Sequence, residues 1–163
     1  MRIAITTDHA GFEALQSLQV HIESLGHTCL SFGPEHFDPQ DDYPDFMFPA
    51  AKAVANGDAD AGVILGGSGQ GEAMAANRIK GVRCAVFYGP VAPRHPIDAH
   101  GHVSDDPYEI IKLSRLHNDA NVLSLGSRFL DMEEMKLAVS VWLEMSFSGE
   151  ERHLRRIGKL DEF

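Results

Sequence analysis

Residues 62–81 read GVILGGSGQGEAMAANRIKG, and this stretch decides the predicted fold. It begins with a short apolar run, Val63-Ile64-Leu65, of the kind that forms a buried parallel strand. Glycines at 66, 67, 69 and 71 follow, and Glu72 then opens an alanine-rich, helix-like segment. A strand, a glycine loop and a helix start together let backbone N–H groups converge on an anion.

The spacing within the loop excludes two common sites. A nucleotide P-loop reads G-x-x-x-x-G-K-[ST], and Gly66 and Gly71 fit it, but Glu72 stands where the lysine belongs. A carboxylate there would repel a triphosphate. A hydrolase elbow, G-x-S-x-G, fails because Gln70 occupies the last glycine position.

The loop sequence alone allows two interpretations of Glu72. A carboxylate beside a cradle of N–H donors suits proton abstraction next to a carbonyl, since the donors hold the developing enolate oxygen. A solvated glutamate is also favoured at a helix start, because the helix dipole attracts negative charge. The loop sequence is compatible with both interpretations.

Composition limits the class of protein. A chain of 163 residues predicts a single domain, 1–163. The formal net charge of −10 argues against nucleic acid and anionic membranes as partners. No apolar run approaches membrane-spanning length, and Cys29 and Cys84 lie in apolar strand-like runs typical of buried thiols. We therefore expect a cytoplasmic protein.

Strand-like and helix-like runs alternate along the chain, which predicts a three-layer α/β/α, Rossmann-like fold around a five-stranded parallel sheet. The predicted strands are 2–6, 28–32, 61–65, 83–87 and 121–125, and the main predicted helices are 12–25, 45–57, 107–116, 132–145 and 150–159. Asp45 is the predicted N-cap of the second helix, and Pro107 suits the first turn of the third. Residues 89–106 read as a flexible loop or lid, and the spacing of their histidines matches no standard zinc site.

Ligands bind outside the carboxyl ends of the strands in open parallel sheets. Strand one delivers Asp8 and His9 to that edge, strand three delivers the glycine loop with Glu72, and strand five delivers Arg128. His117 and Asn118 precede strand five, so they lie at the opposite edge, roughly 16 Å away along a five-residue strand. If both ends act, they serve different copies of the site, which predicts a dimer with shared sites.

The sequence leaves the roles of three further residues undecided. Arg152 and Arg156 lie one helical turn apart and suit a phosphate, although a basic surface helix is the commoner use of such charges. Tyr43 could hydrogen-bond a ligand or simply pack.

Several motifs occur together in order, and jointly they resemble type B ribose-5-phosphate isomerase and the related galactose-6-phosphate isomerase subunits. The motifs are Asp8-His9-Ala10-Gly11, Asp42-Tyr43-Pro44-Asp45, Gly67-Ser68-Gly69-Gln70-Gly71, Ala75-Ala76-Asn77-Arg78, His117-Asn118-Asp119-Ala120-Asn121-Val122-Leu123, Gly126-Ser127-Arg128, and Arg152-His153-x-x-Arg156. The resemblance covers nearly the whole chain.

The resemblance implies a homodimer or dimer of dimers that interconverts aldose and ketose phosphates without a metal or cofactor. By position, His117 helps to open the sugar ring with Asp8 nearby, and Asn118 holds enediolate oxygens together with the loop. Further implied substrate contacts are the loop residues Gly67, Ser68, Gly69, Gln70 and Gly71, the phosphate ligands His9, Arg128, Arg152 and Arg156, and Tyr43.

This chain departs from the family pattern in two places. Many members carry a cysteine base where this chain has Gly66, whereas one branch uses a glutamate directly after the loop, which Glu72 matches. The resemblance thus favours Glu72 as the base that converts ribose 5-phosphate to ribulose 5-phosphate through a cis-enediolate. Residues 89–106 form a longer connection than in typical members, and we expect them to cover the site and alter the preferred sugar.

Other functions stay open on the sequence. The substrate could be allose 6-phosphate, galactose 6-phosphate or a tetrose phosphate. The chain could also be a non-catalytic sugar-phosphate-binding relative that partners an active subunit. A nucleotide-binding α/β module is a third class, against which Glu72 and the missing P-loop lysine argue.

Overall fold

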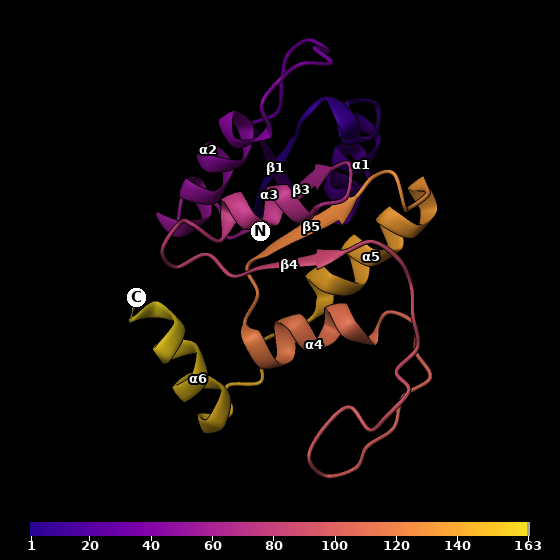
Figure 1. Ribbon diagram of the computed structural model, residues 1–163, viewed down its shortest axis with the longest axis vertical. Helices are drawn as coiled ribbons and strands as arrows, with labels where there is room; N and C mark the ends of the chain where they lie inside the picture. Colours follow the sequence, from indigo (N-terminus) through magenta and orange to yellow (C-terminus); the bar gives the residue numbers. More distant parts are fainter. Residues whose placement is uncertain (163) are drawn as a thin grey trace.

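A computed structural model describes residues 1–162 (Figure 1). The strands are β1 (Arg2–Thr7), β2 (Thr28–Ser31), β3 (Ala61–Gly66), β4 (Cys84–Phe87) and β5 (Val122–Gly126). The helices are α1 (Phe12–Ser24), α2 (Tyr43–Ala55), α3 (Gln70–Ala76), α4 (Glu109–Asn118), α5 (Met132–Glu144) and α6 (Glu151–Asp161), with a 3-10 turn η1 (His9–Gly11) after β1.

The strands form one five-stranded sheet in the order β2-β1-β3-β5-β4, and every neighbouring pair is parallel. This confirms the predicted sheet. The chain winds outward from β1 to β2 and then returns to β3 on the other side of β1. The strand order therefore reverses between β1 and β3, and a crevice opens at such a switch point beyond the carboxyl ends of the strands.

Helices cover both faces of the sheet (Figure 1). The alternation along β3 shows how: Val63 and Leu65 join a core with α1, α4 and α5, while Ile64 joins a second core with α2 and α3. Both cores consist mainly of apolar side chains, and β3 is buried along its whole length. The predicted three-layer α/β/α arrangement is thus confirmed. None of the helices within residues 1–162 is long and apolar enough to cross a lipid bilayer.

Two predicted helix starts were wrong. The N-cap of α2 is Asp42 and not Asp45, which lies in the first turn. The helix begins earlier because Pro44 sits in that turn, where its missing N–H leaves no intrahelical bond unmade. Pro107 lies outside α4, whose N-cap is Tyr108; the N–H of Tyr108 instead bonds to the Asp106 carboxylate.

Residues 89–106 lie outside helices and strands, as predicted. They leave the end of β4 and extend beyond α4 before the chain turns back into that helix (Figure 1). Asp98 organises their tip, since its carboxylate accepts hydrogen bonds from the backbone N–H groups of His100 and His102 and from the His102 ring.

Candidate active site

A cleft of about 260 Å³ opens where the carboxyl ends of the inner strands meet. Its lining residues come from the turn after β1, the start of α2, the loop after β3 and the turn after β5. They are Asp8, His9, Ala10, Tyr43, Gly67, Ser68, Gly71, Glu72 and Arg128. All except Ala10 are among the predicted site residues.

The glycine loop is fixed by hydrogen bonds from the neighbouring strand and the turn that follows it. The hydroxyl of Ser124 donates to the carbonyl of Gly69 at 2.7 Å, and the hydroxyl of Ser127 donates to that of Gly66 at 2.8 Å. Gly69 has a φ of 75°, in the left-handed region that favours glycine. Gly69 itself is buried, and Gln70 is exposed at the start of α3, so neither lines the cleft.

The carboxyl group of Glu72 folds back against Gly66. A Cβ placed on Gly66 would lie 1.9 Å from the Glu72 carboxyl carbon, so only glycine leaves room for this conformation. Glu72 is 5% exposed, which excludes the reading as a solvated helix-start residue. Its Oε2 atom is buried and has no hydrogen-bond partner among residues 1–162.

Burial is also the main reason that the pKa of Glu72 is raised above its ordinary value. The negative charge of Asp8 raises it further, whereas the positive charges of Arg128 and His9 oppose the shift. A carboxylate in such a position is a stronger base than one in water, because ionisation leaves it poorly solvated.

Tyr43 and Arg128 pack directly on the loop. A Cβ on Gly71 would lie 3.0 Å from Cζ of Tyr43, and one on Gly67 would lie 3.1 Å from the guanidinium carbon of Arg128. Because Gly71 and Gly67 have no side chains, the Tyr43 ring and the Arg128 guanidinium can pack at the edge of the cleft. A guanidinium there suits the phosphate of a ligand.

Asp8, His9 and Asp41 lie together at the carboxyl end of β1, where His9 is hydrogen-bonded to Asp41. The Nδ1 atom of His9 is 2.6 Å from Oδ1 of Asp41 and 3.8 Å from Oδ2 of Asp8. These three residues could each offer a ligand atom within 4.8 Å of the others. Two atoms bound to one zinc ion at about 2.1 Å each would stand about 3 Å apart or more, however, so the 2.6 Å contact is a hydrogen bond.

His117 and Asn118 do not line this cleft. They end α4, just before β5 begins, and so lie at the other end of the strands, as predicted. The imidazole of His117 stacks on that of His153 in α6, with ring centroids 4.4 Å apart and an interplanar angle of 12°. Arg152 and Arg156 lie on this same helix, and the Arg152 guanidinium pairs with Glu150 at 2.7 Å.

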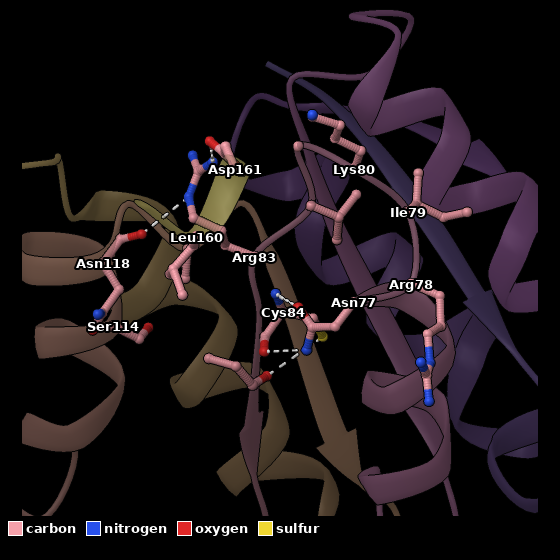
Figure 2. A pocket seen from close by; sticks show the side chains of 14 residues that line it. Asn77, Arg78, Ile79, Lys80, Arg83, Cys84, Ser114, Asn118, Leu160 and Asp161 are labelled. Carbon is pink, nitrogen blue, oxygen red and sulfur yellow. Dashed lines mark hydrogen bonds and ion pairs between the residues drawn. The ribbon is translucent and has the colours of Figure 1, made fainter. Parts of the chain in front are cut away.

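A second hollow, of about 700 Å³, lies at that end, and Asn118 lines it (Figure 2). Arg83 holds the end of α4 in place there, because its Nε donates to the carbonyls of Asn118 at 3.1 Å and Asp119 at 2.9 Å. The Arg83 guanidinium also pairs with the carboxylates of Asp119 at 2.8 Å and Asp161 at 3.8 Å, which ties α4 to α6. Asp119 has a φ of 47°, rare for a residue with a side chain.

The family model for ribose/galactose isomerases matches residues 3–94 and 103–160. The chain belongs to this family. It is 35% identical to ribose-5-phosphate isomerase B of Mycolicibacterium paratuberculosis, over 100% of this chain and 91% of the relative.

Solved structures of family members agree. Type B ribose 5-phosphate isomerase from Trypanosoma cruzi matches with a TM-score of 0.85 and 33% identity, over 99% of this chain and 97% of the other. Ribose-5-phosphate isomerase B from Mycoplasma genitalium, solved with bound ribulose-5-phosphate, matches with a TM-score of 0.82 and 35% identity, over 99% and 94% of the two chains.

Residues 95–102, at the tip of the 89–106 segment, fall outside the family match. No residue of this segment lines the cleft described above, so the expected covering of that cleft does not occur within one chain. Sequence reasoning missed two residues near the functional groups, Asp41 and Arg83. No local pattern marks either residue, because the signal for both is a tertiary contact.

Proposed function

We propose that this ribose/galactose isomerase interconverts ribose 5-phosphate and ribulose 5-phosphate through a cis-enediolate, with Glu72 as the base. The observation that carries the proposal is the buried Glu72 carboxylate, which shares one cleft with a glycine loop and with the cations His9 and Arg128. The ribose-5-phosphate isomerases among its relatives, one of them solved with ribulose-5-phosphate, support the choice of sugar.

In the proposed reaction, the substrate phosphate binds near His9 and Arg128. Glu72 removes the proton from C2 of the open-chain aldose, and the electron pair of that C–H bond forms the enediolate. The same carboxyl group then returns the proton to C1 while the proton of the O2 hydroxyl passes to O1, which gives the ketose with its carbonyl at C2. Backbone N–H groups of the loop and the amide of Asn118 from a second copy of the chain hold the negative oxygen meanwhile.

The raised pKa of Glu72 fits this role, because a base closer in pKa to the working pH transfers protons more efficiently. His117, with Asp8, moves the proton that opens the sugar ring before isomerisation. The reaction needs no redox partner, since the hydrogen that leaves C2 arrives at C1. We assign neither a metal nor a cofactor to it.

Because proposed site residues lie at both ends of the parallel strands, we propose a homodimer or dimer of dimers. His117, Asn118, Arg152 and Arg156 cannot act on a substrate in the cleft of their own chain if they stay at the far end of the strands. A second copy could bring them to it, with the two arginines reaching the phosphate. Such an enzyme would work as one isomerase domain in the cytoplasm, in pentose phosphate metabolism.

The proposal is tested by assaying the purified chain on ribose 5-phosphate, allose 6-phosphate, galactose 6-phosphate and a tetrose phosphate in parallel. We expect the highest kcat/KM on ribose 5-phosphate. The variant Glu72→Gln should lower kcat by about 10²–10⁴-fold, while calorimetry should show that it still binds the sugar phosphate.

Other outcomes would point elsewhere. Near-native turnover by Glu72→Gln would overturn the assignment of the base. A higher kcat/KM on another sugar would replace the proposed substrate. Binding of a sugar phosphate without turnover would indicate a non-catalytic relative, and binding of ATP or NAD instead would indicate a nucleotide module.

A further inference from the structure

The loop before α2 brings one carboxylate, that of Asp41, into contact with His9. Its Oδ1 atom accepts two hydrogen bonds from His9, one from the ring Nδ1 at 2.6 Å and one from the backbone N–H at 3.2 Å. A pair of bonds from one residue to one oxygen fixes both the backbone and the ring of His9. Asp41 does not itself line the cleft, whereas His9 does.

The surroundings of Asp41 require a positive partner. Its side chain is only 8% exposed, and its second oxygen, Oδ2, is buried without a hydrogen-bond partner among residues 1–162. A buried carboxylate is unfavourable unless it is paired with a cation, and the nearest ionisable group is the His9 imidazole. With Nδ1 bonded to Asp41, Nε2 is the ring nitrogen that remains for a ligand.

We propose that Asp41 is a positioning residue of the isomerase site: it holds the His9 ring by Nδ1 and keeps it cationic, so that Nε2–H is presented to the phosphate of the substrate. This inference rests on the proposed function. It gives a role to a residue that touches no substrate and acts through His9.

The charges that face His9 agree with this role. Asp41 raises the pKa of the imidazole through the hydrogen bond, burial opposes that effect, and Asp8 adds to it. Arg128, from the turn after β5, works in the opposite direction. Glu72 of α3 shares the cleft as a further negative charge. The carboxylates of Asp41 and Asp8 thus offset the effect of the positive charge of Arg128 on His9.

A purely structural role for Asp41 predicts a different effect of the Asp41→Asn substitution. If it only tied the 34–42 loop to β1, then Asp41→Asn would keep most of its function, since the amide oxygen can still accept both hydrogen bonds. If the charge matters, Asn fails despite its matching shape. The variant Asp42→Asn is the matched control, because it removes the same charge from the exposed neighbouring residue.

The first measurement does not depend on activity. In the full-length protein labelled with ¹⁵N-histidine, the His9 ring signal, assigned with His9→Gln, is titrated by NMR in the native chain, Asp41→Asn and Asp42→Asn. We expect His9 to titrate above the ordinary histidine value of about 6.5 in the native chain and in Asp42→Asn, and at clearly lower pH in Asp41→Asn. An unchanged His9 titration in Asp41→Asn would overturn the proposal.

The second measurement uses the enzyme. We expect Asp41→Asn to raise KM for ribose 5-phosphate about tenfold at pH 8, which corresponds to a single weakened charged contact, with a smaller effect at pH 6 and little change in kcat. Asp41→Glu should recover part of the loss. An equal rise in KM at both pH values, or a rise matched by Asp42→Asn, would count against the charge of Asp41. Absence of turnover in the native chain would instead overturn the proposed function and leave the titration result standing.

Discussion

The carboxyl group of Glu72 occupies the space that a side chain on Gly66 would fill, since a Cβ there would lie 1.9 Å from the Glu72 carboxyl carbon. The family resemblance places a cysteine base at position 66 in many members, and this chain has glycine there. A base at 66 and a base at 72 would therefore reach the same point of the cleft from two positions in the chain. The two cannot coexist in this conformation, so the position of the Glu72 carboxyl group requires glycine at 66.

We predict that Gly66→Ala inactivates the enzyme although it adds a single methyl group. The new Cβ would force Glu72 away from its position, with a loss in kcat of about 10²-fold or more, the usual contribution of a general base. Gly62→Ala is the control, because it adds a methyl group to the same strand against the side chains of Val122 and Val54, at 3.1 and 3.3 Å. Equal kinetic effects of the two substitutions would show that crowding in β3, and not displacement of Glu72, lowers activity.

Glu72 should also make the folded state depend on pH. Because its pKa is raised in the folded chain, the native state binds more protons than the unfolded state at pH values between the ordinary pKa of about 4.3 and the raised one. Its contribution to stability is therefore present at low pH and is lost as the pH rises through that window.

The variant Glu72→Gln has no charge to bury, so we expect it to melt at the same or a higher temperature than the native chain at pH 8. The two melting curves should approach each other near pH 4, where the carboxyl group of the native chain is mostly protonated in both the folded and the unfolded state. Thermal denaturation followed by circular dichroism across this range measures the difference. A variant that is less stable at pH 8 than at pH 4, relative to the native chain, would show that ionised Glu72 stabilises the fold.

The rate of isomerisation should fall at acid pH as Glu72 is protonated. Neighbouring charges shift the pH at which this fall occurs, because Asp8 raises the pKa of Glu72 and Arg128 lowers it. We predict that Asp8→Asn shifts the midpoint of log kcat against pH downward and that Arg128→Gln shifts it upward. Both variants will also lose activity, but the position of the midpoint does not depend on the size of that loss. Shifts of the same sign would mean that the protonation of another group causes the fall in rate at acid pH.

The contrast between what could and could not be predicted follows from the range of the interactions. Strand β3 and the loop after it were predictable, because apolar runs and glycines act locally and the parallel sheet then fixes which ends meet. The start of α2 was misplaced by a few residues because Asp42 and Asp45 both suit a helix start. The contact between Asp41 and His9 spans 32 positions in the chain and depends on how the 34–42 loop folds over β1, which no local pattern specifies.

The stacking of His117 on His153 bears on ring opening. His153 is 4% exposed, so it offers a fixed surface for the His117 ring at the end of α4. If His117 moves the proton that opens the sugar ring, then His117→Ala should lower kcat/KM on the cyclic substrate by about 10²-fold or more. A substrate analogue that cannot cyclise should lose much less. Stopped-flow assays on the two forms provide the comparison, and equal losses on both would exclude a ring-opening role.

The shared site can be tested by mixing two inactive variants. Glu72→Gln damages the cleft, whereas His117→Ala damages the far end of the fold. When the two chains are unfolded together and refolded in equal amounts, half of the dimers are hybrids, and each hybrid carries one site in which both groups are native. We expect about a quarter of native activity to return, as a two-fold symmetric dimer with shared sites requires.

The control mixture combines Glu72→Gln with Gly66→Ala, which damage the same cleft. Every hybrid site then carries one of the two defects, so no activity should return. Size-exclusion chromatography with light scattering should show the same dimer or larger assembly in both mixtures. If the first mixture is no more active than the mean of its two variants while hybrids are present, then His117 acts within its own chain, and the cleft must reach the far end of α4 by a change in conformation.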